Sequence, residues 1–215
     1  MKNYVITIKD IPQSVEYAQR CIQSASDFDM KVEQFDAVTP RNTDVHKVLK
    51  DEGISRVGFE ERYSRLDNCI AAFLSHYSLW KRCIELGHQI TIFEHDAVIV
   101  DKIPDFINFK GCINLGKPSY GTFKTPKTLG VNSLVSKQYF GGAHAYRITP
   151  SAAKHLVGRA KINAAPTDVY LHNQNFSWLE EYYPWPVDVK DTFTTIQREE
   201  GCLAKHNYGD KYEIV

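Results

Sequence analysis

Two carboxylates one residue apart follow a short apolar run. The run covers residues 90–93, and Glu94-His95-Asp96 comes directly after it. Side chains two residues apart leave a regular strand on the same side, so Glu94 and Asp96 can share one cation. Hard oxygen ligands suit Mg²⁺ or Mn²⁺, and the pattern therefore predicts such a site. The alternative is an acidic pair that only ends a strand in a turn.

The elements around this motif alternate between strand and helix patterns. We expect strands at residues 4–8, 32–37, 90–93, 98–100, 111–115, 139–148 and 185–189. We expect helices at residues 13–25, from a cap at Asp67 or Asn68 to a stop at Gly87, from Thr149-Pro150 to Arg159, and after Pro166-Thr167-Asp168. Residues 41–66 read as a loop with one or two short helices. The alternation predicts a single α/β domain whose ligands bind at the carboxyl edge of the sheet.

The bulk composition narrows the class of protein. The chain has 215 residues, and its 26 basic side chains match its 26 acidic ones, so neither a nucleic acid nor a membrane surface is an expected partner. The five cysteines form no C-x-x-C pair, which indicates reduced thiols. The apolar run at residues 4–8 is too short for a signal sequence or a membrane span. We expect a cytoplasmic protein with no transmembrane segment.

A polar loop is a further candidate for ligand contact. Residues 116–130 contain Lys117, Lys124 and Lys127 and show no apolar period. Their charges could meet a diphosphate if the loop closes over the active face. A solvated loop is the alternative, and it is the more common one.

Seven stretches resemble, in the same order, the motifs of glycosyltransferase family 25, which holds lipooligosaccharide and collagen galactosyltransferases. They are YVITIK at 4–9, FDAV at 35–38, NCIAAFLSHYSLW at 68–80, IFEHDA at 92–97, GAHAYRI at 142–148, SAAKHL at 151–156 and PTD at 166–168. His95 stands where the family has a central acid, so the motif here is E-x-D. A metal held by the two outer positions survives that change.

The resemblance implies a fold and an activity. The fold is a GT-A-type, Rossmann-like nucleotide-sugar-binding domain with a mixed central sheet flanked by helices. Residues 1–100 would form the nucleotide-sugar-binding half, and residues 101–215 the acceptor-side half. The activity would be an inverting, manganese- or magnesium-dependent transfer of galactose or glucose from a UDP-sugar to a glycan or other hydroxyl acceptor, as in lipopolysaccharide biosynthesis.

The resemblance also implies roles for single residues. Asp168 is the expected catalytic base, with Asp188 in reserve; on local sequence, Asp168 could equally be a helix cap. The expected donor-binding residues are Thr7, Ser75, His76, Glu94, His95 and Tyr146. The expected metal ligands are Glu94, Asp96 and His144. For His76 and Tyr146, a purely structural place in the core is the alternative.

Two other functions stay open. His95 and the short chain would also suit a degenerate family member that binds nucleotide-sugar or glycan without turnover. A nucleotidyltransferase would share the carboxylates at a strand end. It is disfavoured because no glycine-rich phosphate loop follows the first strand.

Overall fold

The computed structural model describes residues 1–59, 64–190, 192–198 and 212–215. The strands are β1 (Lys2–Thr7), β2 (Glu33–Asp36), β3 (Ile90–Glu94), β4 (Ala97–Ile99), β5 (Cys112–Asn114), β6 (Gly130–Ser133), β7 (Ala145–Ile148), β8 (Leu179–Tyr183), β9 (Val187–Val189), β10 (Phe193–Thr194) and β11 (Glu213–Ile214). The helices are α1 (Pro12–Ser26), α2 (Val45–Glu52), α3 (Leu66–Leu86), α4 (Pro150–Asn163) and α5 (Thr167–Tyr170), with a 3₁₀ turn η1 (Val57–Phe59).

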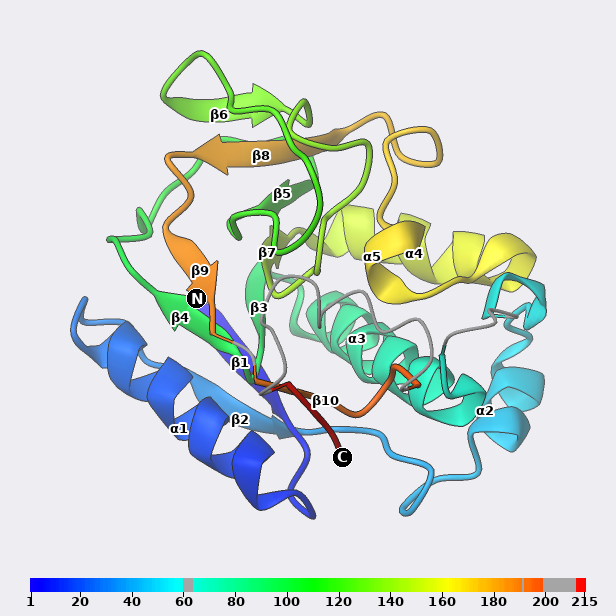
Figure 1. Cartoon of the computed structure of the whole chain (residues 1–215). Coiled ribbons are helices and arrows are strands. Elements are labelled where there is room, and N and C mark those ends of the chain that lie inside the picture. The colour runs from blue at the N-terminus through cyan, green and yellow to red at the C-terminus, as the bar shows by residue number, and fades with distance from the viewer. Residues whose placement is uncertain (60–63, 191, 199–211) are drawn as a thin grey trace.

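Seven strands form one mixed sheet in the order β2-β1-β3-β7-β5-β8-β6 (Figure 1). Strands β2, β1 and β3 are parallel, and β7 runs antiparallel to β3 and β5. Strand β5 is parallel to β8, and β6 closes the edge antiparallel to β8. The structure therefore confirms a mixed α/β fold with a central sheet flanked by helices, compatible with a Rossmann-like glycosyltransferase.

Helices cover both faces of this sheet. On one face, Val5 and Phe93 pack with Ala18 and Cys21 of α1. The other face packs against α3 and α4, and its cluster includes Ile92 of β3. Because β1 and β3 are buried on both sides, they read as nearly continuous apolar runs.

Helix α3 is the longest helix among the described residues, and its apolar period holds it in the core. Phe73 and Trp80 are fully buried and meet edge to face, with ring centroids 5.5 Å apart. Gly87 ends the helix at φ +68, where its N–H reaches the carbonyls of Cys83 and Ile84. The prediction of the start was wrong, because Arg65 occupies the N-cap position and makes no side-chain cap.

The region before β7 also differs from the prediction. A strand was expected over residues 139–148, but β7 covers only Ala145–Ile148. Gly142 at φ +90 and Ala143 at φ +50 turn the chain into β7. A Cβ on Gly142 would lie 2.3 Å from Ser119 Oγ, so both the backbone angle and the space require glycine.

The predicted cap of α4 is confirmed. Thr149 accepts a hydrogen bond from the N–H of Ala152 and caps α4, which runs four residues beyond Arg159.

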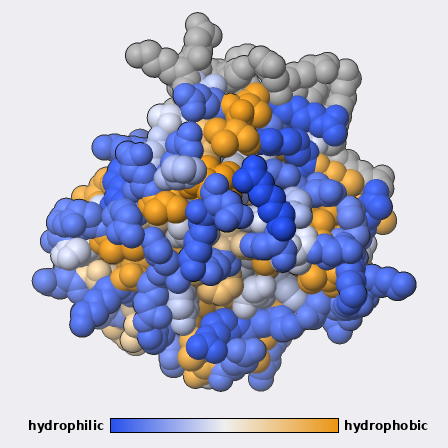
Figure 2. Space-filling model, turned by 90° about the horizontal axis from the view of Figure 1, so that it is seen from below, coloured by the Kyte–Doolittle hydropathy of each residue, from blue (hydrophilic) through white to orange (hydrophobic). Residues whose placement is uncertain are grey.

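Cys21, Cys69, Cys83 and Cys112 are free and buried, and Cys202 lies outside the described residues. No helix in the described ranges is long and apolar enough to cross a membrane. Polar side chains cover most of the face in Figure 2, with apolar ones in small groups between them.

Candidate active site

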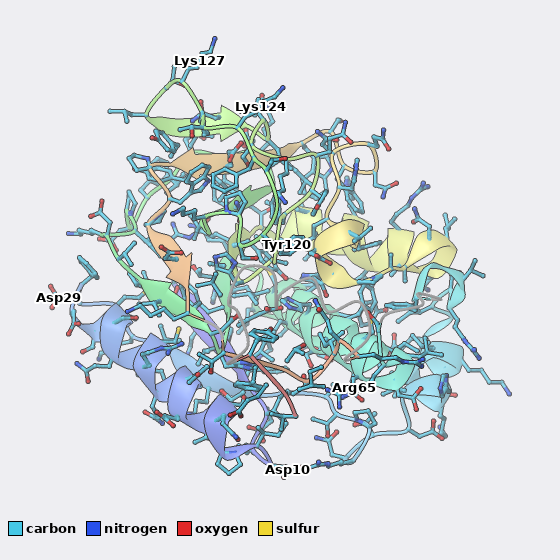
Figure 3. The ribbon with its side chains drawn as sticks, in the orientation of Figure 1. Asp10, Asp29, Arg65, Tyr120, Lys124 and Lys127 are labelled. Atoms are coloured by element: carbon cyan, nitrogen blue, oxygen red, sulfur yellow. The ribbon has the colours of Figure 1, made fainter. Side chains whose placement is uncertain are left out.

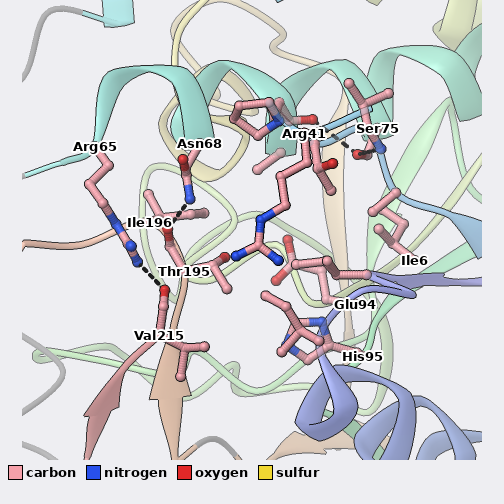
Figure 4. A pocket seen from close by; sticks show the side chains of 18 of the residues that line it. Ile6, Arg41, Arg65, Asn68, Ser75, Glu94, His95, Thr195, Ile196 and Val215 are labelled. Atoms are coloured by element: carbon pink, nitrogen blue, oxygen red, sulfur yellow. Dashed lines mark hydrogen bonds between the residues drawn. The ribbon is translucent and has the colours of Figure 1, made fainter. Parts of the chain in front are cut away.

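A pocket of about 370 Å³ opens at the carboxyl ends of β1 and β3, beside the first half of α3 (Figure 4). Its walls come from four regions of the fold, each built partly from residues that are distant in sequence from the others. They are the ends of β1 and β3 (Ile6, Ile8, Ile11, Glu94, His95), the segment after β2 (residues 37–41), the start of α3 (Arg65, Asn68, Ala71, Ala72, Ser75, His76), and the region of β10 and β11 (Thr195, Ile196, Val215). This is the edge at which open α/β sheets bind ligands.

A buried chain of hydrogen bonds holds Glu94 at the pocket wall. The indole N–H of Trp80 donates to the hydroxyl oxygen of Tyr146 over 2.8 Å. That hydroxyl lies 2.8 Å from Nδ1 of His76, and Nε2 of His76 lies 3.0 Å from Oε1 of Glu94. Trp80, Tyr146 and His76 are each at most 1% exposed.

The protonation states of these side chains determine which group donates in each of the hydrogen bonds. Burial lowers the pKa of His76 to about 3, so its ring is neutral and carries one proton. An ionised Glu94 accepts only, which places that proton on Nε2. Nδ1 of His76 must then accept a hydrogen bond from the hydroxyl of Tyr146. The oxygen of that hydroxyl in turn accepts a hydrogen bond from the indole N–H of Trp80. His76 is thus a fixed donor to the carboxylate.

Ser75 joins the pocket floor to the segment after β2. Its hydroxyl donates to the carbonyl of Ala71 over 3.0 Å and accepts from the N–H of Val38 over 2.9 Å. The side chain of Asn42 holds the same turn, because it accepts from the N–H of Thr39 and donates to the carbonyl of Ala37. This wall of the pocket is therefore an ordered turn.

His95 is held on the opposite side of the motif. Its ring stacks on Phe193 with centroids 5.3 Å apart and planes within 3°. Nδ1 lies 3.1 Å from the hydroxyl of Ser14, which also accepts from the N–H of Ile8. Burial lowers the pKa of His95 to about 4, so the ring is neutral near pH 7.

The segment formed by residues 192–198 and 212–215 makes the last wall; we call it the β10–β11 segment. Strand β10 pairs in parallel with β11. The segment is tied to the start of α3 by Arg65, whose guanidinium donates to the carbonyls of Thr194 (3.2 Å) and Val215 (2.7 Å). The amide of Asn68 donates to the carbonyl of Thr195 over 2.6 Å (Figure 4).

Comparison with known families identifies the chain. The model of glycosyltransferase family 25 (LPS biosynthesis protein) matches residues 1–112, more than half of the 215. The chain belongs to glycosyltransferase family 25. A search of curated proteins found no match. The match contains Ser75, His76 and Glu94, whereas the resemblances at residues 142–148, 151–156 and 166–168 lie outside it.

Among the described residues, the side chains around Glu94 do not form a complete set of protein ligands for a metal ion. No three His, Cys, Asp or Glu side chains in the described ranges come together to hold a metal. Glu94, Asp96 and His144 are therefore not gathered into the expected three-ligand set. Asp96 is not among the pocket-lining residues, and its charge adds to the burial that raises the pKa of Cys21, on the α1 face, to about 12.

The carbonyl of His144 accepts from the N–H of Glu94 over 2.9 Å, but the His144 side chain is buried in the core. Its ring packs on Gly116, where a Cβ would come within 2.3 Å of Nε2. Burial lowers the pKa of His144 to about 4, and the charge of Asp188 partly opposes this. A cation at Glu94 and Asp96 stays a prediction, since Mg²⁺ commonly takes only one or two carboxylates and fills its shell with phosphates and water.

Asp168 lies in a second polar cluster. It is the second residue of α5, and Pro166 rather than Asp168 occupies the cap position, so the helix-cap alternative is not the one found. One carboxylate oxygen accepts from the hydroxyl of Tyr120, and the other accepts from the N–H of Val169. Its charge partly opposes the burial that lowers the pKa of His76, but Asp168 is not among the pocket-lining residues.

Tyr120 and Lys137 were missed by the sequence reasoning. Lys137 donates to the carbonyl of Tyr120, and its ammonium lies 4.6 Å from the centre of the Tyr120 ring. Burial raises the pKa of Tyr120, and the charge of Asp168 adds to that effect, so the hydroxyl stays protonated as a donor. A tyrosine in a polar loop carries no local signal for such a role.

Three other predicted residues are not among those that line the pocket. Thr7 is buried, and its hydroxyl donates to the carbonyl of Val5 over 3.2 Å, while its neighbours Ile6 and Ile8 line the pocket. Tyr146 does not line the pocket, but its hydroxyl is hydrogen-bonded to His76, which does. Asp188 sits in β9, where its carboxylate accepts from the N–H of Val189.

Proposed function

We propose that this family 25 protein transfers a sugar from a nucleotide-sugar donor to a hydroxyl acceptor, with the nucleotide in the pocket described above. The observation that carries the proposal is the position of that pocket. It lies at the carboxyl ends of parallel strands, with Glu94 on its wall, in a chain that belongs to a glycosyltransferase family. Its largely apolar lining suits a base and a ribose, and Glu94 offers an acceptor for sugar hydroxyls.

The finer parts of the proposal concern the donor and the reaction. We propose UDP-galactose or UDP-glucose as donor, a glycan or related alcohol as acceptor, and inversion in one in-line displacement. In such a displacement a base takes the proton of the attacking hydroxyl. Asp168 is the candidate base, and Tyr120 orients its carboxylate by donating a hydrogen bond.

We further propose that Mn²⁺ or Mg²⁺ assists. Glu94 and Asp96 would be its protein ligands, and the ion would neutralise the charge of the departing nucleoside diphosphate. Adding Mn²⁺ and then EDTA to the assay below tests this part separately from sugar transfer.

The test measures release of UDP from UDP-galactose and UDP-glucose, with and without an acceptor mixture. Asp168→Asn should lower the rate roughly 10²- to 10⁴-fold, as expected for loss of a general base, while calorimetry shows unchanged UDP binding. Asp29→Asn is the matched control, because Asp29 is exposed at the far end of α1 (Figure 3). Full turnover by Asp168→Asn would remove Asp168 from the mechanism.

A second candidate is a protein that binds nucleotide-sugar without turnover. His95 favours it, because the central position of the motif holds a neutral ring stacked on Phe193 instead of a carboxylate. Such a protein would bind UDP in calorimetry and release none from any UDP-sugar, with or without Mn²⁺.

A further inference from the structure

Two arginines line the pocket, and the fold uses them differently. Arg65 and Arg41 are the permanently charged cations among the described lining residues. The guanidinium of Arg65 is committed to the fold, because it donates to the carbonyls of Thr194 and Val215. These hydrogen bonds hold the β10–β11 segment in place, so fewer N–H donors of Arg65 remain for a ligand.

Arg41 is in the opposite situation. It follows Pro40, and its side chain reaches into the pocket toward Glu94 (Figure 4). Within the described ranges, Arg41 makes no hydrogen bond through its side chain and no ion pair within 4.0 Å. The turn that presents it is nevertheless fixed, because Asn42 and Ser75 hold the backbone on either side of Thr39.

Lys117, Lys124 and Lys127, the lysines that could have met a diphosphate, are not among the pocket-lining residues. Lys124 and Lys127 project from the loop next to β6, at the opposite end of the molecule from Arg65 at the pocket (Figure 3). Lys124 is exposed there, and its N–H donates to the carbonyl of Ser136. Within the described pocket wall, the positive charge left for an anion is therefore that of Arg41.

We propose that Arg41 binds the diphosphate of the donor. This inference rests on the proposed function, since it assumes that a nucleotide enters the pocket. A guanidinium presents a planar fork of N–H donors that matches phosphate oxygens in pairs. The base and ribose would pack on the apolar wall, and Arg41 would then select a nucleoside diphosphate over a nucleoside.

The experiment compares UDP with uridine, which shares the base and ribose but has no phosphate. Both are titrated by calorimetry into the 215-residue chain in EDTA, so that no divalent cation contributes. Arg41→Ala should weaken UDP binding roughly 10- to 100-fold, the range expected for hydrogen bonds to a charged group, and change uridine binding less than about twofold. Arg41→Lys should recover part of the loss.

The control is Arg56→Ala, which removes an exposed arginine outside the pocket. It should bind UDP and uridine as the wild type does. An equal loss of UDP and uridine binding in Arg41→Ala, or no loss of either, would overturn the role of Arg41 while leaving the donor site standing. A wild-type protein that binds neither UDP nor uridine would overturn the proposed donor and the role of Arg41 with it.

Discussion

Replacing Tyr146 by phenylalanine removes one hydroxyl group from the middle of the Trp80–Tyr146–His76 chain. That hydroxyl accepts from the indole of Trp80 and donates to Nδ1 of His76, both over 2.8 Å. All three side chains are at most 1% exposed, so water does not replace the lost partner. The substitution therefore leaves one buried donor and one buried acceptor unsatisfied.

The expected cost follows from those two groups. An unsatisfied buried polar group costs about 1–3 kcal/mol, so Tyr146→Phe should lower the free energy of unfolding by about 2–6 kcal/mol. Tyr170→Phe is the matched control, because Tyr170 is equally buried and its hydroxyl donates to the carbonyl of Leu156. That carbonyl lies inside α4 and keeps its helical donor, so the control should lose only about 0.5–1.5 kcal/mol.

Urea unfolding, followed by circular dichroism, measures both variants. A nitrogen-15 spectrum of the histidine rings adds a second readout, since the wild type should carry the His76 proton on Nε2. Equal losses of stability in Tyr146→Phe and Tyr170→Phe, or a proton on Nδ1 in the wild type, would refute the direction of the chain and the fixed hydrogen bond to Glu94.

Two further predictions concern stability. Burial lowers the pKa of His76 to about 3 and the pKa values of His95 and His144 to about 4, so below pH 6.5 the unfolded chain binds protons that the folded chain does not. The free energy of unfolding should thus fall by about 1.4 kcal/mol per histidine between pH 7.5 and pH 5.5, and urea titrations showing equal stability would contradict this. Gly116→Ala should cost about 1–3 kcal/mol because its Cβ would meet the His144 ring, whereas Gly158→Ala in α4, where the space is open, should gain about 0.5–1 kcal/mol. Thermal melts of the two alanine variants that shift in the same direction would argue against the packing described at Gly116.

Local patterns predicted the parts of the fold that local forces determine. The apolar period of α3, its glycine stop and the Thr149 cap depend on neighbours within a few residues. Strand β8 was missed because it carries two buried glutamates, which break the apolar pattern. Glu181 is tolerated there because the N–H groups of Val135 and Ser136, in the loop after β6, and the indole of Trp185, in the turn after β8, donate to it.

The candidate site was predicted only in part, for a related reason. Residues two apart share a side only within a regular strand, and β3 ends at Glu94, so Asp96 lies in the turn that follows. The pairing of His76 with Glu94 and the position of Arg41 depend on how α3 and the turn after β2 dock on the sheet. The spacing of residues in a single sequence contains no record of that docking.

The β10–β11 segment gives this pocket a wall from outside residues 1–112, the range that the family model matches. Ligand binding in the pocket and packing of the β10–β11 segment are then coupled. A ligand that binds more tightly when the segment is in place stabilises the packed segment by the same factor. Chains that share the first 112 residues could therefore differ in which ligands the pocket accepts through contacts of this segment alone, while the carboxyl edge of the sheet stays the same.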